Sequence, residues 1–149
     1  MTNRMFALTA AVVLATGAGL FASEKKIQLK NMPAAVQKAV EEHTKGSTIV
    51  GYVEEHEDGK VFYEAETKVS GRTRDLLFDA NGVLVEVEEE VAADTLPAAV
   101  KTALSTRGKV LKVEAVTKGS IVTYEAEVEK NGKKSEVVMD ARGNAIERR

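Results

Sequence analysis

The sequence predicts an α+β fold, a tandem repeat of one helix packed on a four-stranded antiparallel meander sheet. Three short blocks recur in the same order, offset by 64, 61 and 61 residues: Met32–Val40 with Leu96–Leu104, Tyr63–Glu66 with Tyr124–Glu127, and Asp79–Gly82 with Asp140–Gly143. Within each copy the spacing of apolar residues changes from about four to two, which is typical of a helix followed by strands. We therefore predict two copies, at residues 29–91 and 92–149.

Residues 1–22 are predicted to be a cleaved signal peptide. Arg4 is the only charged residue in this segment, a strongly apolar stretch occupies residues 5–15, and small residues follow it. A membrane-spanning helix needs about 20 consistently apolar residues, and this stretch is shorter. We expect cleavage after Ala22, with Ala18 as the alternative site, and a periplasmic or secreted mature chain. The other interpretation is an uncleaved N-terminal anchor.

The first element of each copy is predicted to be a short amphipathic helix. Apolar residues recur four positions apart, namely Met32, Val36 and Val40 in the first copy and Leu96, Val100 and Leu104 in the second. Pro33 and Pro97 fall in the first turn, where the missing N–H costs nothing. Gly46 and Gly108 follow as stop signals. We expect Val100 and Leu104 to be buried between helix and sheet.

Four strands are predicted after each helix. Apolar and polar residues alternate along residues 61–69 and 122–129, as half-buried strands require, and this register makes Tyr63 and Tyr124 core residues. Turns divide the strands at Asp58-Gly59, Ser70-Gly71, Asp79–Gly82, Lys118-Gly119, Asn131-Gly132 and Asp140–Gly143. The final strands are expected at Val83–Val87 and Asn144–Glu147. Because each helix covers one face of its sheet, the other face is expected to be open.

The composition excludes several classes of function. The 149 residues include 23 acidic and 21 basic side chains, two His and no Cys. The absence of Cys rules out disulfides, thiolate metal sites and thiol nucleophiles, and a net charge of −2 argues against a general nucleic-acid binder. The sequence contains no Ser/His/Asp set, phosphate-binding loop or zinc pair. We therefore predict a protein that is not an enzyme, with no catalytic residues, no cofactor and no metal ligands.

The Leu-Pro-x-Ala-Val helix, the Tyr-Glu-Ala-Glu strand and the Asp-x-x-Gly hairpin together resemble the PepSY-like domains. The matching stretches are Leu96–Leu104, Tyr124–Glu127 and Asp140–Gly143, with counterparts that begin at Met32, Tyr63 and Asp79. In particular, the chain is similar to the secreted beta-lactamase-inhibitor-like PepSY-like family, whose members often carry tandem copies. The resemblance implies an extracytoplasmic, non-enzymatic domain that inhibits or chaperones a secreted hydrolase.

Four apolar residues are predicted to form a protein-binding patch on the open face: Phe62, Leu77, Leu84 and Ile121. Each falls where strand alternation alone would place a polar residue, and an apolar patch on an open face is typical of a contact surface. We expect the partner to be an unidentified extracytoplasmic protein, with glutamates as the polar rim of the contact. No nucleic acid and no membrane is expected as a partner of the mature chain.

The alternative function is a small-ligand or divalent-cation sensor that uses the acidic turns. Asp79–Gly82 resembles the start of a calcium loop, but its Gly is fourth instead of sixth, which favours a hairpin turn. His56 lies among carboxylates in Glu54–Asp58, a setting that suits either a divalent cation or a solvated turn. His43 is expected to close the first helix, where the helix dipole favours a cation.

Overall fold

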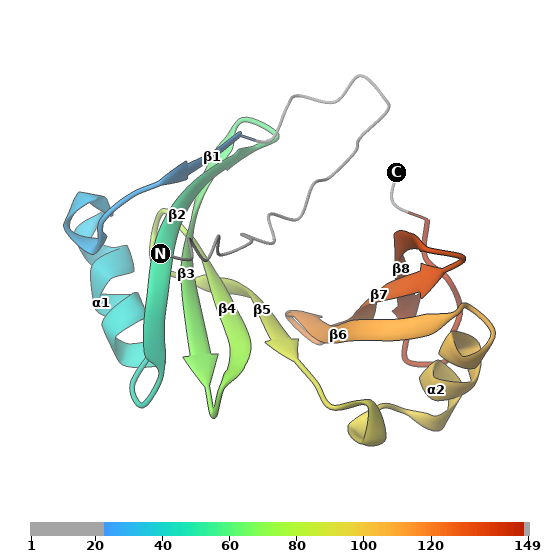
Figure 1. The fold of residues 1–149 in the computed structure, drawn as a ribbon. Coiled ribbons are helices and arrows are strands. Elements are labelled where there is room, and N and C mark those ends of the chain that lie inside the picture. Colours follow the sequence, from blue (N-terminus) through green and yellow to red (C-terminus); the bar gives the residue numbers. More distant parts are fainter. Residues whose placement is uncertain (1–22, 148–149) are drawn as a thin grey trace, which may run out of the picture.

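The computed structural model describes residues 23–147, so the predicted signal peptide at residues 1–22 lies outside the described residues. Eight antiparallel strands form one sheet in the order of the chain (Figure 1). The strands are β1 (Ser23–Lys26), β2 (Thr48–Glu57), β3 (Lys60–Val69), β4 (Arg72–Asp79), β5 (Leu84–Glu90), β6 (Lys109–Lys118), β7 (Ile121–Lys130) and β8 (Lys133–Asp140). The helices are α1 (Ala34–His43) and α2 (Ala98–Ser105), which follow short 3-10 turns η1 (Leu29–Asn31) and η2 (Ala93–Thr95). The predicted α+β class is confirmed.

Both helices begin directly after the proline that the sequence places in their first turn. Pro33 and Pro97 each have a φ of −54°, close to the value that the proline ring imposes, and so direct the chain into the helix. The buried helix residues are Val36 and Val40 in α1 and Val100 and Leu104 in α2. Val100 is 0% exposed and Leu104 is 3% exposed, so their predicted burial is confirmed.

Two separate hydrophobic cores lie between the helices and the sheet. The first core consists of Met32, Val36, Val40, Tyr63, Ala65, Leu76 and Phe78. The second core consists of Leu96, Val100, Leu104, Val113, Ala126, Val128 and Met139. Tyr63 belongs to the first core and Tyr124 packs against the second, as the strand alternation predicts. Each half of the chain therefore has an apolar interior of its own.

Both cores lie on the same face of the continuous sheet. Leu76 of the first core lies opposite Val87 of β5, and Val87 lies opposite Thr117 of β6. Thr117 in turn lies opposite Val122. Val122 is two residues before Tyr124 and therefore lies on the same face as Tyr124, which packs against the second core. Figure 1 shows α1 beside the first strands and α2 beside the last ones. The two helices thus cover one face and leave the other face open.

The turns after β4 and β8 are each held by the side chain of one aspartate. Asp79 Oδ1 accepts the backbone N–H groups of Asn81 and Val83 at 2.9 Å each. In the second half, Asp140 Oδ1 accepts the backbone N–H groups of Arg142 and Asn144 at 2.8 and 2.9 Å. The hydrogen bonds to Asp79, above all the one from the Val83 N–H, hold the pKa of Asp79 below its usual range. The hairpin interpretation of this acidic segment is therefore confirmed.

The number of strands differs from the prediction at both ends of the sheet. β1 is an additional strand, and its four polar residues contain no apolar alternation that would have indicated it. At the other end, the prediction of a strand at Asn144–Glu147 is wrong, because this segment forms one isolated bridge between Met139 and Ala145. Among the described residues, four strands therefore follow α1 and three follow α2.

β5 takes part in both halves of the molecule. Its residues 84–89 pair with β4, and its residues 87–90 pair with β6. The N–H of Val91, just after β5, bonds the carbonyl of Val113 on β6 at 2.9 Å. The N–H of Ile27, just after β1, bonds the carbonyl of Tyr52 on β2 at 3.0 Å. β1 is therefore placed beside β2 as β5 is placed beside β6, and β5 joins the halves.

Candidate functional site: the acidic open face

Carboxyl groups from five adjacent strands gather on the open face. Glu64 lies between Tyr63 and Ala65, whose side chains belong to the first core, so the Glu64 side chain points to the opposite face. The register of the strands places further carboxyl groups on that face. Together with Glu64 they form what we call the acidic face: Glu55 on β2, Glu66 on β3, Asp75 on β4, Glu86, Glu88 and Glu90 on β5, and Glu114 on β6.

A small hollow lies on the open face between β2 and β5, lined by four carboxyl groups of the acidic face on β2, β3 and β5, by Asp75 on β4, and by Glu57 beside them. The hollow has a volume of about 90 Å³ and is lined by Glu55, Glu57, Glu64, Asp75, Leu77, Glu86 and Glu88. Leu77 lies opposite Glu64 on β3 and opposite Glu86 on β5. One apolar side chain is therefore surrounded by six carboxyl groups.

Burial keeps two of these carboxyl groups protonated at neutral pH. Loss of hydration raises the pKa of Glu64 to about 9, and the nearby Glu55 carboxylate adds to the rise. The same loss of hydration raises the pKa of Glu88 to about 8, and Glu86 adds to that rise. Burial also raises the pKa of Glu55, whose side chain shares a hydrogen bond with Glu64. Protonation thus allows neighbouring carboxyl groups to lie close together.

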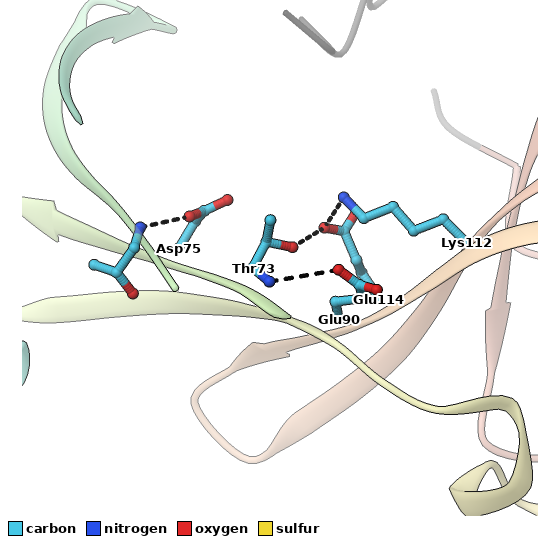
Figure 2. Close-up of polar contacts among 6 residues, drawn as sticks. Thr73, Asp75, Glu90, Lys112 and Glu114 are labelled. Carbon is cyan, nitrogen blue, oxygen red and sulfur yellow. Dashed lines mark hydrogen bonds and ion pairs between the residues drawn. The ribbon is translucent and has the colours of Figure 1, made fainter. Parts of the chain in front are cut away.

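Two opposing effects act on the pKa of Asp75. Its Oδ1 accepts the backbone N–H of Thr67 at 3.0 Å, a bond that favours the charged form (Figure 2). Burial has the larger effect and raises the pKa of Asp75 to about 6. At neutral pH Asp75 is therefore mostly ionised while the adjacent Glu88 is mostly neutral.

Two lysines of β6 form ion pairs with the acidic face. Lys118 Nζ lies 2.8 Å from Glu86 Oε2, and Lys112 Nζ lies 2.5 Å from Glu114 Oε1. These two ammonium groups balance two of the eight carboxyl groups that make up the acidic face. Even with two further groups protonated, the face carries a net negative charge at neutral pH.

The structure places three of the four residues that the sequence predicts as an apolar patch on the open face. Leu77 lies in the hollow. Phe62 lies on the open face, opposite Glu55 on one side and Asp79 on the other. Ile121 is 65% exposed at the start of β7, opposite Lys118. These three side chains share the open face.

The predicted placement of Leu84 on the open face is wrong. Leu84 packs against the first core, on the face that α1 covers. The register of β4 and β5 shifts, so that Leu77 lies opposite Glu86 whereas Phe78 lies opposite Leu84. This bulge adds one residue to β5 and reverses the face on which Leu84 lies. The contact role of Phe62, Leu77 and Ile121 stays a prediction.

The acidic face is a site that the sequence did not predict, since the glutamates were expected only as the polar rim of an apolar contact. Their signal in the sequence is the recurrence of acidic residues two positions apart, as at Glu64 and Glu66 and along residues 86–90. Such residues share one face of a strand. Their gathering also requires knowing which strands are neighbours, which the sequence spacing alone does not provide.

The histidines lie outside the acidic hollow. His56 Nε2 lies 2.9 Å from Glu54 Oε1 in an exposed position. His43 is the last residue of α1, as expected, and its ring centroid lies 5.8 Å from that of Phe78. Among residues 23–147, no three His, Asp or Glu side chains are grouped to hold a metal ion. Within the same range, no helix has the length and apolar character needed to cross a membrane.

The fold makes this an α+β protein, in which two helices cover one face of a single sheet and carboxyl groups line the other. The profile of a family described as beta-lactamase-inhibitor-like, PepSY-like matches the sequence twice, over residues 21–86 and 62–147. The chain belongs to this family. No curated protein matches the sequence.

Solved structures with a similar fold come from Bacteroides species. A BLIP-like protein from Bacteroides fragilis is 24% identical, with a TM-score of 0.59 over 78% of this chain and 84% of that one. A Bacteroides eggerthii protein that is described as periplasmic is 20% identical, with a TM-score of 0.65 over 78% and 86%. A DUF2874 family protein from Bacteroides uniformis is 22% identical, with a TM-score of 0.63 over 77% and 86%. These likenesses concern the fold.

Proposed function

We propose that the chain is an extracytoplasmic, non-enzymatic binding module whose open face binds a positively charged surface of a partner protein. The observation that carries this proposal is the hollow of six carboxyl groups on a sheet face without helix cover. Half-buried acidic groups with raised pKa values reduce the stability of the fold. Such groups cluster at functional sites more than elsewhere.

A cationic partner relieves this electrostatic cost. A Lys or Arg side chain placed beside Glu64 or Glu88 lowers the pKa of that carboxyl group, so binding releases protons and forms ion pairs. Leu77 offers an apolar contact for the aliphatic stem of the same side chain. Phe62 and Ile121 are the outlying apolar contacts. Affinity is therefore expected to rise with pH from about 6 to about 9 and to fall with added salt.

The partner class that we propose is an extracytoplasmic hydrolase, which the module inhibits or chaperones. The description of the family as beta-lactamase-inhibitor-like supports this choice. The predicted signal peptide at residues 1–22, together with a structural neighbour described as periplasmic, supports a periplasmic or secreted location. The alternative function, a cation sensor that uses the acidic turns, stays a prediction, and Asp79 Oδ1 already accepts two hydrogen bonds within its own turn.

We also infer that the two halves are tandem copies of one unit, at residues 29–91 and 92–149. The twofold match of the family profile supports this inference. A Cβ added to Gly82 would lie 2.6 Å from the carbonyl oxygen of Ala35 in α1, and one added to Gly143 would lie 2.6 Å from that of Ala99 in α2. The final turn of each half therefore approaches its own helix in the same way.

The test of the binding proposal compares three immobilised chains exposed to an envelope fraction at low salt. One is the wild type, and one carries Glu55→Gln, Glu64→Gln and Glu88→Gln in the hollow. The control carries Glu41→Gln, Glu42→Gln and Asp94→Asn, which remove the same number of acidic groups at exposed positions elsewhere. We expect wild type and control to retain the same hydrolase and the hollow variant to lose it.

Three outcomes decide between the functions. Retention of every partner by the hollow variant contradicts binding through the acidic face. Loss of partners by Phe62→Ser with Ile121→Ser, in a chain that stays folded, supports these residues as apolar contacts. Binding of calcium alone that Asp79→Asn removes favours the cation sensor over the protein-binding module.

A further inference from the structure

The two halves of the sheet meet in a narrow seam. β5 pairs with β6 through four residue pairs, from Val87 with Thr117 to Glu90 with Glu114. β2 with β3, and likewise β6 with β7, pair through nine residue pairs. The two hydrophobic cores share no buried residue. A connection of this kind is a place where one half can turn against the other.

A short series of polar contacts reaches across the seam on the open face (Figure 2). The backbone N–H of Thr73 on β4 donates to Glu90 Oε2 on β5 at 3.4 Å. The hydroxyl of Thr73 donates to Glu114 Oε1 on β6, also at 3.4 Å. Lys112 Nζ lies 2.5 Å from that same Glu114 oxygen. We call these three interactions the seam contacts. The bond from Thr73 to Glu114 runs from the first half to the second, whereas the other two lie on either side of the seam and hold its two ends.

The seam contacts are specific to the junction. The repeat offsets of 61 and 64 residues give the positions that correspond to Thr73, Glu90, Lys112 and Glu114, which are Lys134, Lys26, Gly51 and Val53. This second set contains no carboxyl group to which a lysine or hydroxyl could bond. The seam contacts therefore do not belong to the repeating unit, and they act where the halves join.

Carboxyl groups face each other across the seam and beside it. Glu90 lies opposite Glu114 across the seam, and Asp75 lies opposite Glu88 on the β4 side of β5. Like charges directly opposite destabilise a strand pair. The titratable groups around Glu88 on the open face are Glu86 and Glu90 on β5, Asp75 on β4, Glu114, Lys112 and Lys118 on β6, and Glu125 on β7. Burial raises the pKa of Glu88 to about 8, so this side chain is mostly neutral at pH 7 and gains its charge above that pH.

We propose that the seam is a pH-responsive hinge, which the seam contacts hold closed while Glu88 is neutral and which loosens when Glu88 becomes charged. The proton that leaves Glu88 exposes a negative charge to Asp75 and Glu114, the groups on the two flanking strands. Lys112 and Lys118 are already paired with other carboxylates. Because each half has its own core, both halves stay folded while the angle between them becomes variable.

Distance measurements between the two helices test the hinge. The chain has no native Cys, so Lys38→Cys in α1 and Thr102→Cys in α2 place one spin label on the exposed side of each helix. Double electron–electron resonance at about pH 6 and about pH 9 brackets the titration of Glu88. We expect a narrow distance distribution at the lower pH and a broader one at the higher pH.

Variants separate the hinge from a general effect of pH. Glu88→Gln stays neutral, so the broadening at high pH is expected to be lost, whereas the exposed control Glu42→Gln is expected to keep it. Thr73→Val removes the hydroxyl donor and is expected to broaden the distribution already at about pH 6. Equal widths at both pH values in the wild type, or undiminished broadening in Glu88→Gln, would overturn the proposal. Loss of the far-ultraviolet circular dichroism signal at about pH 9 would also overturn it, because both halves must stay folded.

Discussion

Asp75 lies directly opposite Glu88 where β4 pairs with β5, so two carboxyl groups face each other on the open side of the sheet. The same relationship recurs on both sides, since Glu66 lies opposite Asp75 and Glu90 lies opposite Glu114. Solubility alone does not account for it, because surface glutamates serve solubility equally well when they are dispersed and fully hydrated. This row of carboxyl groups destabilises the fold, and we propose that the protein keeps it because it binds a partner protein.

The stability of the protein is expected to fall as the pH rises from about 5 to about 9. In the folded chain the pKa of Glu64 is about 9 and that of Glu88 is about 8, against an ordinary value of 4.5 for both. Between the ordinary and the raised values the folded chain holds protons that the unfolded chain has released. Each increase in pH therefore favours unfolding, until the raised pKa values are passed. Urea unfolding at a series of pH values measures this slope.

Substitution of Glu64 identifies the source of that pH dependence. Glu64→Gln removes the titration with the highest pKa, so the variant is expected to gain stability relative to the wild type at about pH 9. The control Glu42→Gln removes an exposed carboxyl group from α1 and is expected to leave the slope unchanged. A wild-type stability that rises from about pH 5 to about pH 9 would show that these groups are not protonated in the folded chain.

Leu104→Ala is expected to destabilise the protein by about 2–5 kcal/mol. Leu104 is 3% exposed and belongs to the second core, so its removal leaves a cavity between α2 and the sheet. The exposed neighbour Ser105 provides the control, because Ser105→Ala removes no packing contact in that core. Chemical denaturation measures the difference, and an unchanged midpoint for Leu104→Ala would mean that α2 is not packed on the sheet.

Gly82→Ala is expected to cost more stability than Gly59→Ala. Both glycines have a positive φ, of +81° and +74°, so both substitutions introduce a similar strain of about 1–2 kcal/mol. A Cβ at Gly59 meets nothing within 4 Å, whereas one at Gly82 would lie 2.6 Å from the carbonyl oxygen of Ala35. The difference between the two variants in thermal unfolding reports the close approach of the turn to α1. Equal losses would mean that the turn and the helix are not in contact.

Mass spectrometry of the envelope fraction is expected to find a mature N-terminus near Ser23. The apolar stretch of residues 5–15 and the small residues after it predict cleavage after Ala22, with Ala18 as the alternative site. A full-length chain that begins at Met1 and resides in the cytosol would contradict the prediction of a signal peptide.

The sequence predicted the features that depend on local spacing. The four-residue apolar spacing identified α1 and α2, and the glycine turns located the hairpins between the strands of each half. The strand β1 was not predicted because its sequence, Ser-Glu-Lys-Lys, has no apolar residue and so no alternation of apolar and polar residues. Its place in the sheet is visible only from its pairing with β2. Leu84 was misplaced because a single-residue bulge reverses the face of a strand without changing its composition.

The candidate site could be predicted only in part. The acidic residues two positions apart on β3 and β5 were visible in the sequence, and so was their shared face within each strand. The hollow was not visible, because it depends on the register that places Leu77 between Glu64 and Glu86. The degree of burial, which raises the pKa values, also results from packing across strands.

Carbon-13 NMR titration of the glutamate carboxyl groups tests most directly whether the open face is a partly buried acidic site. Glu64→Gln and Glu88→Gln assign the two resonances by their disappearance. We expect these carboxyl groups to titrate at about 9 and about 8. Midpoints near 4.5 for both groups would show that the open face is an ordinary hydrated surface, and would contradict the site proposed here.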